Sequence, residues 1–147
     1  MSLLDDLKNA LKDAMRAKDK ISLSTIRMAL AAVKQREVDE RIELNDSDVI
    51  ALLTKMVKQR KDAASQFEQA NRQDLVTIEL AEIDILQTFL PQALSEEELS
   101  VLIDQAMVES QASGMQDMGK VMAWLKPKVQ GRADMGKLSG QIKAKLV

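Results

Sequence analysis

The chain has 147 residues, of which 46% are hydrophobic and 30% charged, and its formal net charge is −2, so we expect a folded globular protein. It contains no His, Cys or Tyr, which excludes disulfides, Ser–His and Cys–His catalytic pairs, and zinc sites built on imidazole or thiolate. No apolar run is long enough for a membrane helix, and residues 1–8 lack the pattern of a signal peptide. Together these features predict a cytoplasmic protein.

Apolar residues recur at helical spacing along most of the chain, and only five Gly and two Pro are present, which argues against a β fold. Ser2 with Asp5 predicts the start of the first helix. The next three helices are expected over about residues 21–39, from the cap cluster at 45–48 onward, and over about 73–90 after a break at Asn71.

Pro91 ends the fourth predicted helix, because proline disfavours a helical conformation in the residue before it. Ser95 and Glu98 have the spacing of a capping box and open the next helix. We place the domain boundary here. The predicted fold is all-α, with an N-terminal domain of about four helices (residues 1–93) and a three-helix tail domain (residues 94–147).

The tail contains a short internal repeat. The motif Asp-Met-Gly-Lys occurs at residues 117–120 and again at 134–137. Each copy precedes an amphipathic segment, and each aspartate is a candidate helix N-cap, so we expect two similar helix starts, with the first helix over about residues 118–129. Trp124 lies beside the apolar stripe of this helix, which favours packing over base stacking.

The charge is divided unevenly. Residues 119–147 carry seven basic side chains and one acid, a formal charge of +6, and the preceding 118 residues carry −8. Such a basic tail is typical of a surface that binds phosphates or another polyanion, although lysines that only solubilise a helical domain would look the same. The candidate nucleic-acid-binding residues are Lys120, Lys126, Lys128, Arg132, Lys137 and Lys145.

Residues 131–137 fit the spacing G-x-x-x-x-G-K of a nucleotide-binding loop. Leu138 stands where such a loop needs Ser or Thr, and a predicted helix precedes the motif in place of a strand. We therefore interpret the segment as a turn between helices.

Two other groups of basic residues are interspersed with acids, and we interpret them as solvated helix faces. They are Lys34, Arg36 and Arg41 in the second predicted helix and Lys55, Lys58, Arg60 and Lys61 in the third. No spacing of carboxylates indicates a metal site, and no cofactor or catalytic residue is predicted.

Several segments resemble the YqeY family, which is itself similar to the C-terminal tail domain of the B subunit of the tRNA-dependent amidotransferase. The tail carries the pattern G-K-V-M, P-K-V-x-G-R-A-D and G-K-L, in which we take Gly119, Gly131 and Gly136 to be structural. Further matches lie at residues 23–34, 66–75 and 90–95. Met135 departs from the family pattern, in which Gly-Lys often follows the aspartate directly.

The resemblance implies a helical domain followed by a three-helix tail, and a link to tRNA in which the basic tail residues face the RNA. We therefore expect a non-catalytic module that binds tRNA or other structured RNA, with no membrane contact. One alternative is an accessory component of an aminoacyl-tRNA amidotransferase, a carbon–nitrogen ligase with glutamine as amide donor, with that enzyme or a synthetase as protein partner. A second alternative is a protein-docking module.

Overall fold

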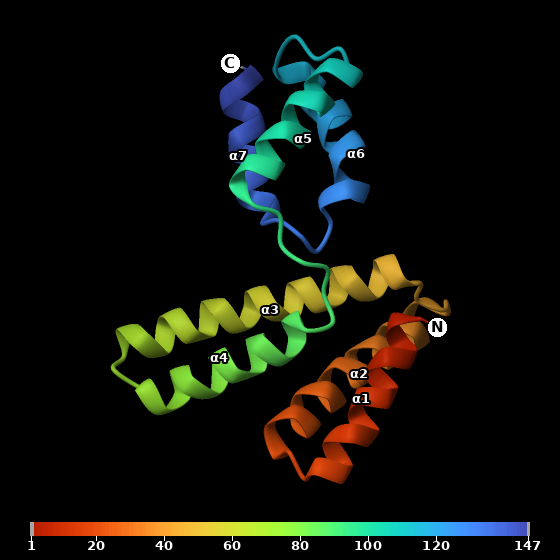
Figure 1. The fold of residues 1–147 in the computed structure, drawn as a ribbon, viewed down its shortest axis with the longest axis vertical. Coiled ribbons are helices and arrows are strands. Elements are labelled where there is room, and N and C mark those ends of the chain that lie inside the picture. The colour runs from red at the N-terminus through yellow and green to blue at the C-terminus, as the bar shows by residue number, and fades with distance from the viewer. Residues whose placement is uncertain (1, 147) are drawn as a thin grey trace. The chain divides into compact units, whose positions relative to one another are not determined.

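The computed structural model describes residues 2–146, which are all-helical and contain no strand, as the sequence predicts. The chain forms two compact units, Met1–Pro91 and Gln92–Val147, whose helices are drawn in Figure 1. Each unit has its own hydrophobic core. The domain boundary expected at residue 93 stays a prediction. None of the helices within residues 2–146 combines the length and the apolar character needed to cross a bilayer.

The first unit contains four helices, which are α1 (Leu3–Ala17), α2 (Lys20–Glu40), α3 (Asp46–Gln69) and α4 (Gln73–Gln87). In Figure 1, α1 and α2 form one antiparallel pair and α3 and α4 form another. Helix α4 is shorter than predicted, because the N–H groups of Thr88, Phe89 and Leu90 bond to carbonyls three residues earlier and convert its last turn into tight turns.

Local polar contacts define the helix starts. Ser2 and Asn45 each form a capping box, with Asp5 and Asp48 respectively, and Asp19 caps α2 through Ser22. The connections need left-handed backbone at four non-glycine residues, which are Lys18, Arg41, Asn71 and Gln111. Asn71 therefore makes the break that the sequence predicts between α3 and α4.

One charged side chain is buried in the first unit, among residues 2–91. Leu7, Val49, Leu53 and Leu86 of the core are fully buried, and Arg60 of α3 is only 8% exposed. Its Nε lies 3.0 Å from Oε2 of Glu82 in α4, and its Nη1 donates to the Met56 carbonyl at 3.3 Å. The expectation that Arg60 lies on a solvated face is wrong, because this ion pair joins α3 to α4 inside the unit.

The second unit contains α5 (Glu96–Glu109), a short 3-10 helix η1 (Met115–Asp117), α6 (Met118–Val129) and α7 (Met135–Leu146). Ser95 caps α5 by accepting a hydrogen bond from the Glu98 N–H at 3.1 Å, and α6 has the predicted bounds. The three α-helices bury one apolar cluster: Leu99, Ile103, Ala106, Val121, Leu125, Val129, Leu138, Ile142 and Leu146. Trp124 packs against this cluster, as expected.

The two repeat aspartates have different roles. Asp134 accepts hydrogen bonds from the N–H groups of Gly136 and Lys137, at 2.8 and 3.4 Å, and so caps α7 as predicted. Asp117 makes no cap hydrogen bond to α6. Its Oδ2 accepts instead from the Ser113 N–H at 2.9 Å and the Ser113 hydroxyl at 3.3 Å. The capping prediction is wrong for Asp117, because η1 leads directly into α6 and the carboxylate turns back to the preceding loop.

The Arg60–Glu82 pair makes a prediction about stability. Arg60→Met leaves the Glu82 carboxylate, whose side chain is 16% exposed, without its partner, and we expect the free energy of unfolding to fall by about 2–3 kcal/mol. Arg60→Met combined with Glu82→Leu should recover most of this loss, because no buried charge remains. Urea unfolding followed by circular dichroism measures both, and equal losses in the single and double variants would contradict the explanation.

The contact between Asp117 and Ser113 predicts a pH dependence. Hydrogen bonds from the Ser113 backbone lower the pKa of Asp117 below its usual value of 3.8, with a smaller contribution from Lys120. A lowered folded-state pKa stabilises the fold above the unfolded value, and the stabilisation is lost as the pH falls through the folded pKa. Asp117→Asn should therefore lower the urea midpoint at pH 7, and the difference should shrink below pH 3.8. Fluorescence of Trp124, the single tryptophan, reports the unfolding of this unit. A difference that persists unchanged at low pH would rule out the ionised carboxylate as its cause.

Candidate nucleic-acid interface

The antiparallel packing of α6 and α7 separates the six candidate residues into two groups. Lys126 and Lys128 lie in the last turn of α6 and Lys137 in the first turn of α7, and Arg132 lies in the turn that joins them. Lys120 lies in the first turn of α6 and Lys145 in the last turn of α7, at the opposite end of the helix pair (Figure 1). A 12-residue helix spans about 18 Å, so the structure brings four of the six residues together and leaves two far from them.

The three lysines at the shared end are exposed. Lys126, Lys128 and Lys137 have no ion pair within residues 2–146. The acid of this connection, Asp134, accepts hydrogen bonds from backbone N–H groups. The Lys128 ammonium lies 3.9 Å from the centroid of the Trp124 ring. This cation–π contact places the charge above a ring that itself packs on the core, which restricts the position of the ammonium.

Arg132 has a different environment. Its Nε donates to the Gln92 carbonyl at 2.9 Å, and its own carbonyl accepts from the Leu94 N–H at 2.8 Å. These two bonds tie the segment before α5 to the turn between α6 and α7. The side chain is half-exposed. Because its Nε is bonded to the Gln92 carbonyl, only its terminal nitrogens remain to contact another ligand.

The two residues at the opposite end have acidic neighbours. Lys120 Nζ lies 3.8 Å from Asp117 Oδ1, and Lys145 donates to Asp104 of α5. Each of these lysines is therefore partly neutralised, which makes this end a weaker attractor for an anion than the end with Lys126, Lys128 and Lys137.

The glycines of the tail differ in what they contribute. Gly131 has φ of +75° in the turn after α6, a conformation that side chains rarely adopt. A Cβ at Gly136 would lie 3.2 Å from the capping Oδ1 of Asp134, whereas Gly119 has open space around it. Because α6 precedes this segment, the spacing G-x-x-x-x-G-K belongs to a helix–turn–helix connection, as predicted.

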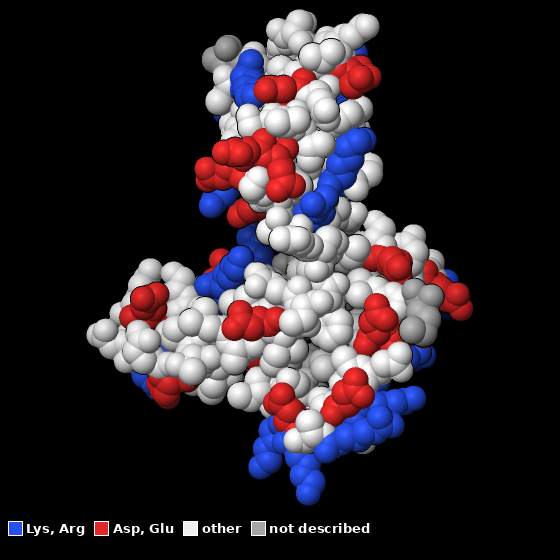
Figure 2. All heavy atoms as spheres, in the orientation of Figure 1, with Lys and Arg blue, Asp and Glu red and all other residues white. Residues whose placement is uncertain are grey.

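Charge in the second unit is separated by face. Residues 92–147 contain seven basic and seven acidic side chains, so the tail lysines belong to a unit with no net charge. Figure 2 shows acidic side chains gathered over α5 and basic side chains along α6. The acids of α5 are Glu96, Glu97, Glu98, Asp104 and Glu109. The formal charge of +6 on residues 119–147 is thus offset by the acids at residues 96–117 of the same unit.

No group of three acidic side chains within residues 2–146 is arranged to hold a metal ion. The features of the unit that could attract an anion are the three exposed lysines at the shared end of α6 and α7 and the stacked Lys128–Trp124 pair. Sequence spacing contained a signal for that pair, since residues four apart lie on one helix face. Sequence spacing contained no signal for the bonds of Arg132 and Lys145, because their partners are 40 and 41 residues away.

Comparison with known proteins supports a family assignment. Residues 4–146 match the YqeY family, described as Yqey-like protein. Three similar curated proteins share the name "Altered inheritance of mitochondria protein 41, mitochondrial". The one from Lachancea thermotolerans is 34% identical over 126 residues, which cover 81% of this chain and 67% of the relative. For Clavispora lusitaniae the values are 40% over 99 residues, 65% and 58%, and for Pyrenophora tritici-repentis 32% over 132 residues, 88% and 72%.

The chain thus spans roughly three fifths to seven tenths of the length of these relatives. Their names place them in mitochondria, and this finding contradicts the predicted cytoplasmic localisation. The prediction rested on missing cysteines and a missing secretory pattern, and neither feature distinguishes the cytoplasm from a mitochondrial compartment. The family match covers nearly the whole chain, and the protein belongs to the YqeY family.

Proposed function

We propose that this protein binds structured RNA, with tRNA as the first candidate, through the lysines where α6 ends and α7 begins. We call this group the lysine cluster, and it comprises Lys126, Lys128 and Lys137. The observation that supports the proposal is that these three exposed ammonium groups lie around one helix–turn–helix connection without an acidic partner in residues 2–146.

Lysines rather than backbone groups would carry the contact. A helix N-terminus can bind a phosphate through its free N–H groups, but Asp134 already accepts from those of Gly136 and Lys137 at the start of α7. The side chains remain as the donors. Three exposed point charges suit the phosphate backbone of double-helical RNA, which proteins recognise mainly by shape and by backbone contacts.

The acidic α5 would limit how RNA can approach. The five acids of this helix repel phosphates, while the lysine cluster attracts them. A polyanion bound to α6 and α7 would therefore be oriented away from α5. The resemblance to the amidotransferase tail domain is consistent with this arrangement but does not by itself establish function.

The direct test is fluorescence anisotropy with total tRNA and the variant Lys126→Ala/Lys128→Ala/Lys137→Ala. We expect its affinity to fall by about tenfold or more at low salt, and the slope of log affinity against log salt to decrease by about one per lost phosphate contact. Arg132 is left intact, because its bond to Gln92 supports the fold.

The matched control is Lys55→Ala/Lys58→Ala/Lys61→Ala, which removes three exposed lysines from α3. We expect it to bind tRNA nearly as tightly as the parent. Equal losses in the two variants would indicate a diffuse charge effect, and unchanged binding in the first variant would remove the lysine cluster from the interface.

A further inference from the structure

The outer face of α2 has an unusual composition for a surface exposed to solvent. Between Lys20 and Val38 every exposed residue falls into three adjacent columns with a seven-residue repeat. The first column contains Lys20, Arg27 and Lys34, the second Ile21, Met28 and Gln35, and the third Ser24, Ala31 and Val38.

These columns have the pattern of a coiled-coil seam. If Ile21 is heptad position a, the second column is a, the third is d and the first is g. No charged residue occupies an a or d position from Ile21 to Val38. Ile21, Met28 and Val38 are 45%, 44% and 60% exposed, and the Met28 sulfur also lies 3.9 Å from Nη2 of Arg60 in α3. Ile42 lies beyond the end of α2 and is 45% exposed. An ordinary solvated face would carry charges at these positions.

Every g position is basic. Lys20, Arg27 and Lys34 follow one another at intervals of seven residues, about 10 Å apart along α2. Arg41, seven residues further on, is the left-handed residue that ends the helix. Within residues 2–146 none of the four takes part in an ion pair or a side-chain hydrogen bond. The column is therefore a row of basic side chains without an ion-pair partner, beside exposed apolar side chains.

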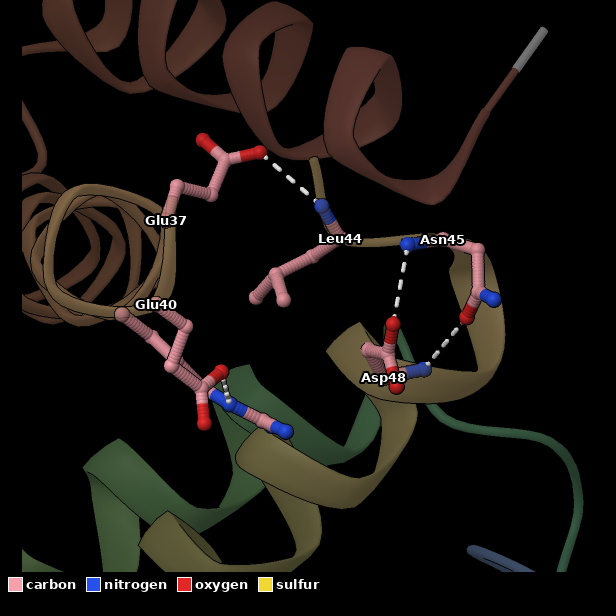
Figure 3. Close-up of polar contacts among 6 residues, drawn as sticks. Glu37, Glu40, Leu44, Asn45 and Asp48 are labelled. Carbon is pink, nitrogen blue, oxygen red and sulfur yellow. Dashed lines mark hydrogen bonds and ion pairs between the residues drawn. The ribbon is translucent and has the colours of Figure 1, made fainter. Parts of the chain in front are cut away.

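The acids at the end of α2 make no ion pair with this row, and Figure 3 shows two of them, Glu37 and Glu40, with other partners. Glu37 accepts from the Leu44 N–H at 3.0 Å, and Glu40 binds Nε of Arg36 at 2.9 Å. Asp39 accepts from the Gln35 amide at 2.9 Å. At the other end Asp19 is occupied in capping the helix.

We propose that the outer face of α2 docks an amphipathic helix of another protein, one whose apolar stripe is flanked by acidic residues at seven-residue spacing. Apolar a and d side chains would pack against the partner's stripe, and the basic column would pair with its acids. The proposal is independent of RNA binding by the lysine cluster.

A second copy of α2 does not fit this description. In an antiparallel pair the basic column would face itself, which is repulsive. In a parallel pair Lys20, Arg27 and Lys34 would face positions e of the other copy. Those positions hold Thr25, Ala32 and Asp39, of which one is acidic and Thr25 is fully buried. The charge pattern therefore selects a different, acidic helix.

The test is an NMR titration of the full chain with two synthetic three-heptad peptides. Both have Leu at a and d; the acidic peptide has Glu at e and g, and the basic peptide has Lys there. We expect the acidic peptide to shift the amide signals of α2, those of Ile21, Met28 and Val38 among them, and the basic peptide to leave them unchanged.

Two variants separate the charge column from the apolar seam. Arg27→Glu/Lys34→Glu/Arg41→Glu should weaken binding of the acidic peptide by about tenfold or more and create binding of the basic one. Ile21→Gln/Val38→Gln keeps the charges of the basic column and should also weaken binding of the acidic peptide. The control Lys55→Glu/Lys58→Glu/Lys61→Glu makes the same charge change on α3 and should leave α2 binding intact.

Several outcomes would overturn the proposal. Absence of α2 shifts with the acidic peptide would do so, as would shifts confined to the lysine cluster of α6 and α7. If the charge-reversed α2 variant loses affinity for tRNA while its response to both peptides is unchanged, the basic column is a nucleic-acid contact and the docking proposal is wrong.

Discussion

The antiparallel packing of α6 against α7 is the constraint on which the proposed RNA surface depends. Val121, Leu125 and Val129 of α6 are fully buried with Leu138 and Ile142 of α7. Because this contact fixes the two helices side by side, the last turn of one lies next to the first turn of the other. The left-handed backbone of Gly131 allows the short connection. Lys126, Lys128 and Lys137 thereby lie at one end of the helix pair, while Lys120 and Lys145 lie at the opposite end.

Charge in this protein is organised by helix face more than by sequence segment. The second unit has no net charge, yet α5 is acidic and the end of α6 is basic. On α2 the acids near the end of the helix form local hydrogen bonds. The basic side chains of the g column form no ion pair within residues 2–146. Net charge alone would suggest neither surface, because attraction of a partner depends on which charges remain uncompensated and how they are spaced.

The parts of the fold that could be predicted from sequence were those set by local interactions. Ser95, Asn45 and Asp134 cap helices because their side chains reach N–H groups two or three residues away. The parts that could not be predicted depend on contacts between distant residues. Arg60 forms an ion pair with Glu82, 22 residues away. The Arg132 side chain donates a hydrogen bond to the carbonyl of Gln92, 40 residues away. Periodicity identifies a helix face but not the element that packs against it. The candidate lysines could therefore be identified from the sequence, but not which of them lie at the same end of the α6–α7 pair.

The measurement that tests the central claim most directly is an NMR titration of the full chain with an unmodified tRNA transcript, followed through backbone amide signals. The account predicts that the largest shifts fall between Lys126 and Lys137, with small shifts at Lys120 and Lys145 in the same unit. Shifts concentrated at those two residues, or a titration without changes in α6 and α7, would contradict it. Either result would mean that the end of the helix pair formed by the lysine cluster is not an RNA-binding surface.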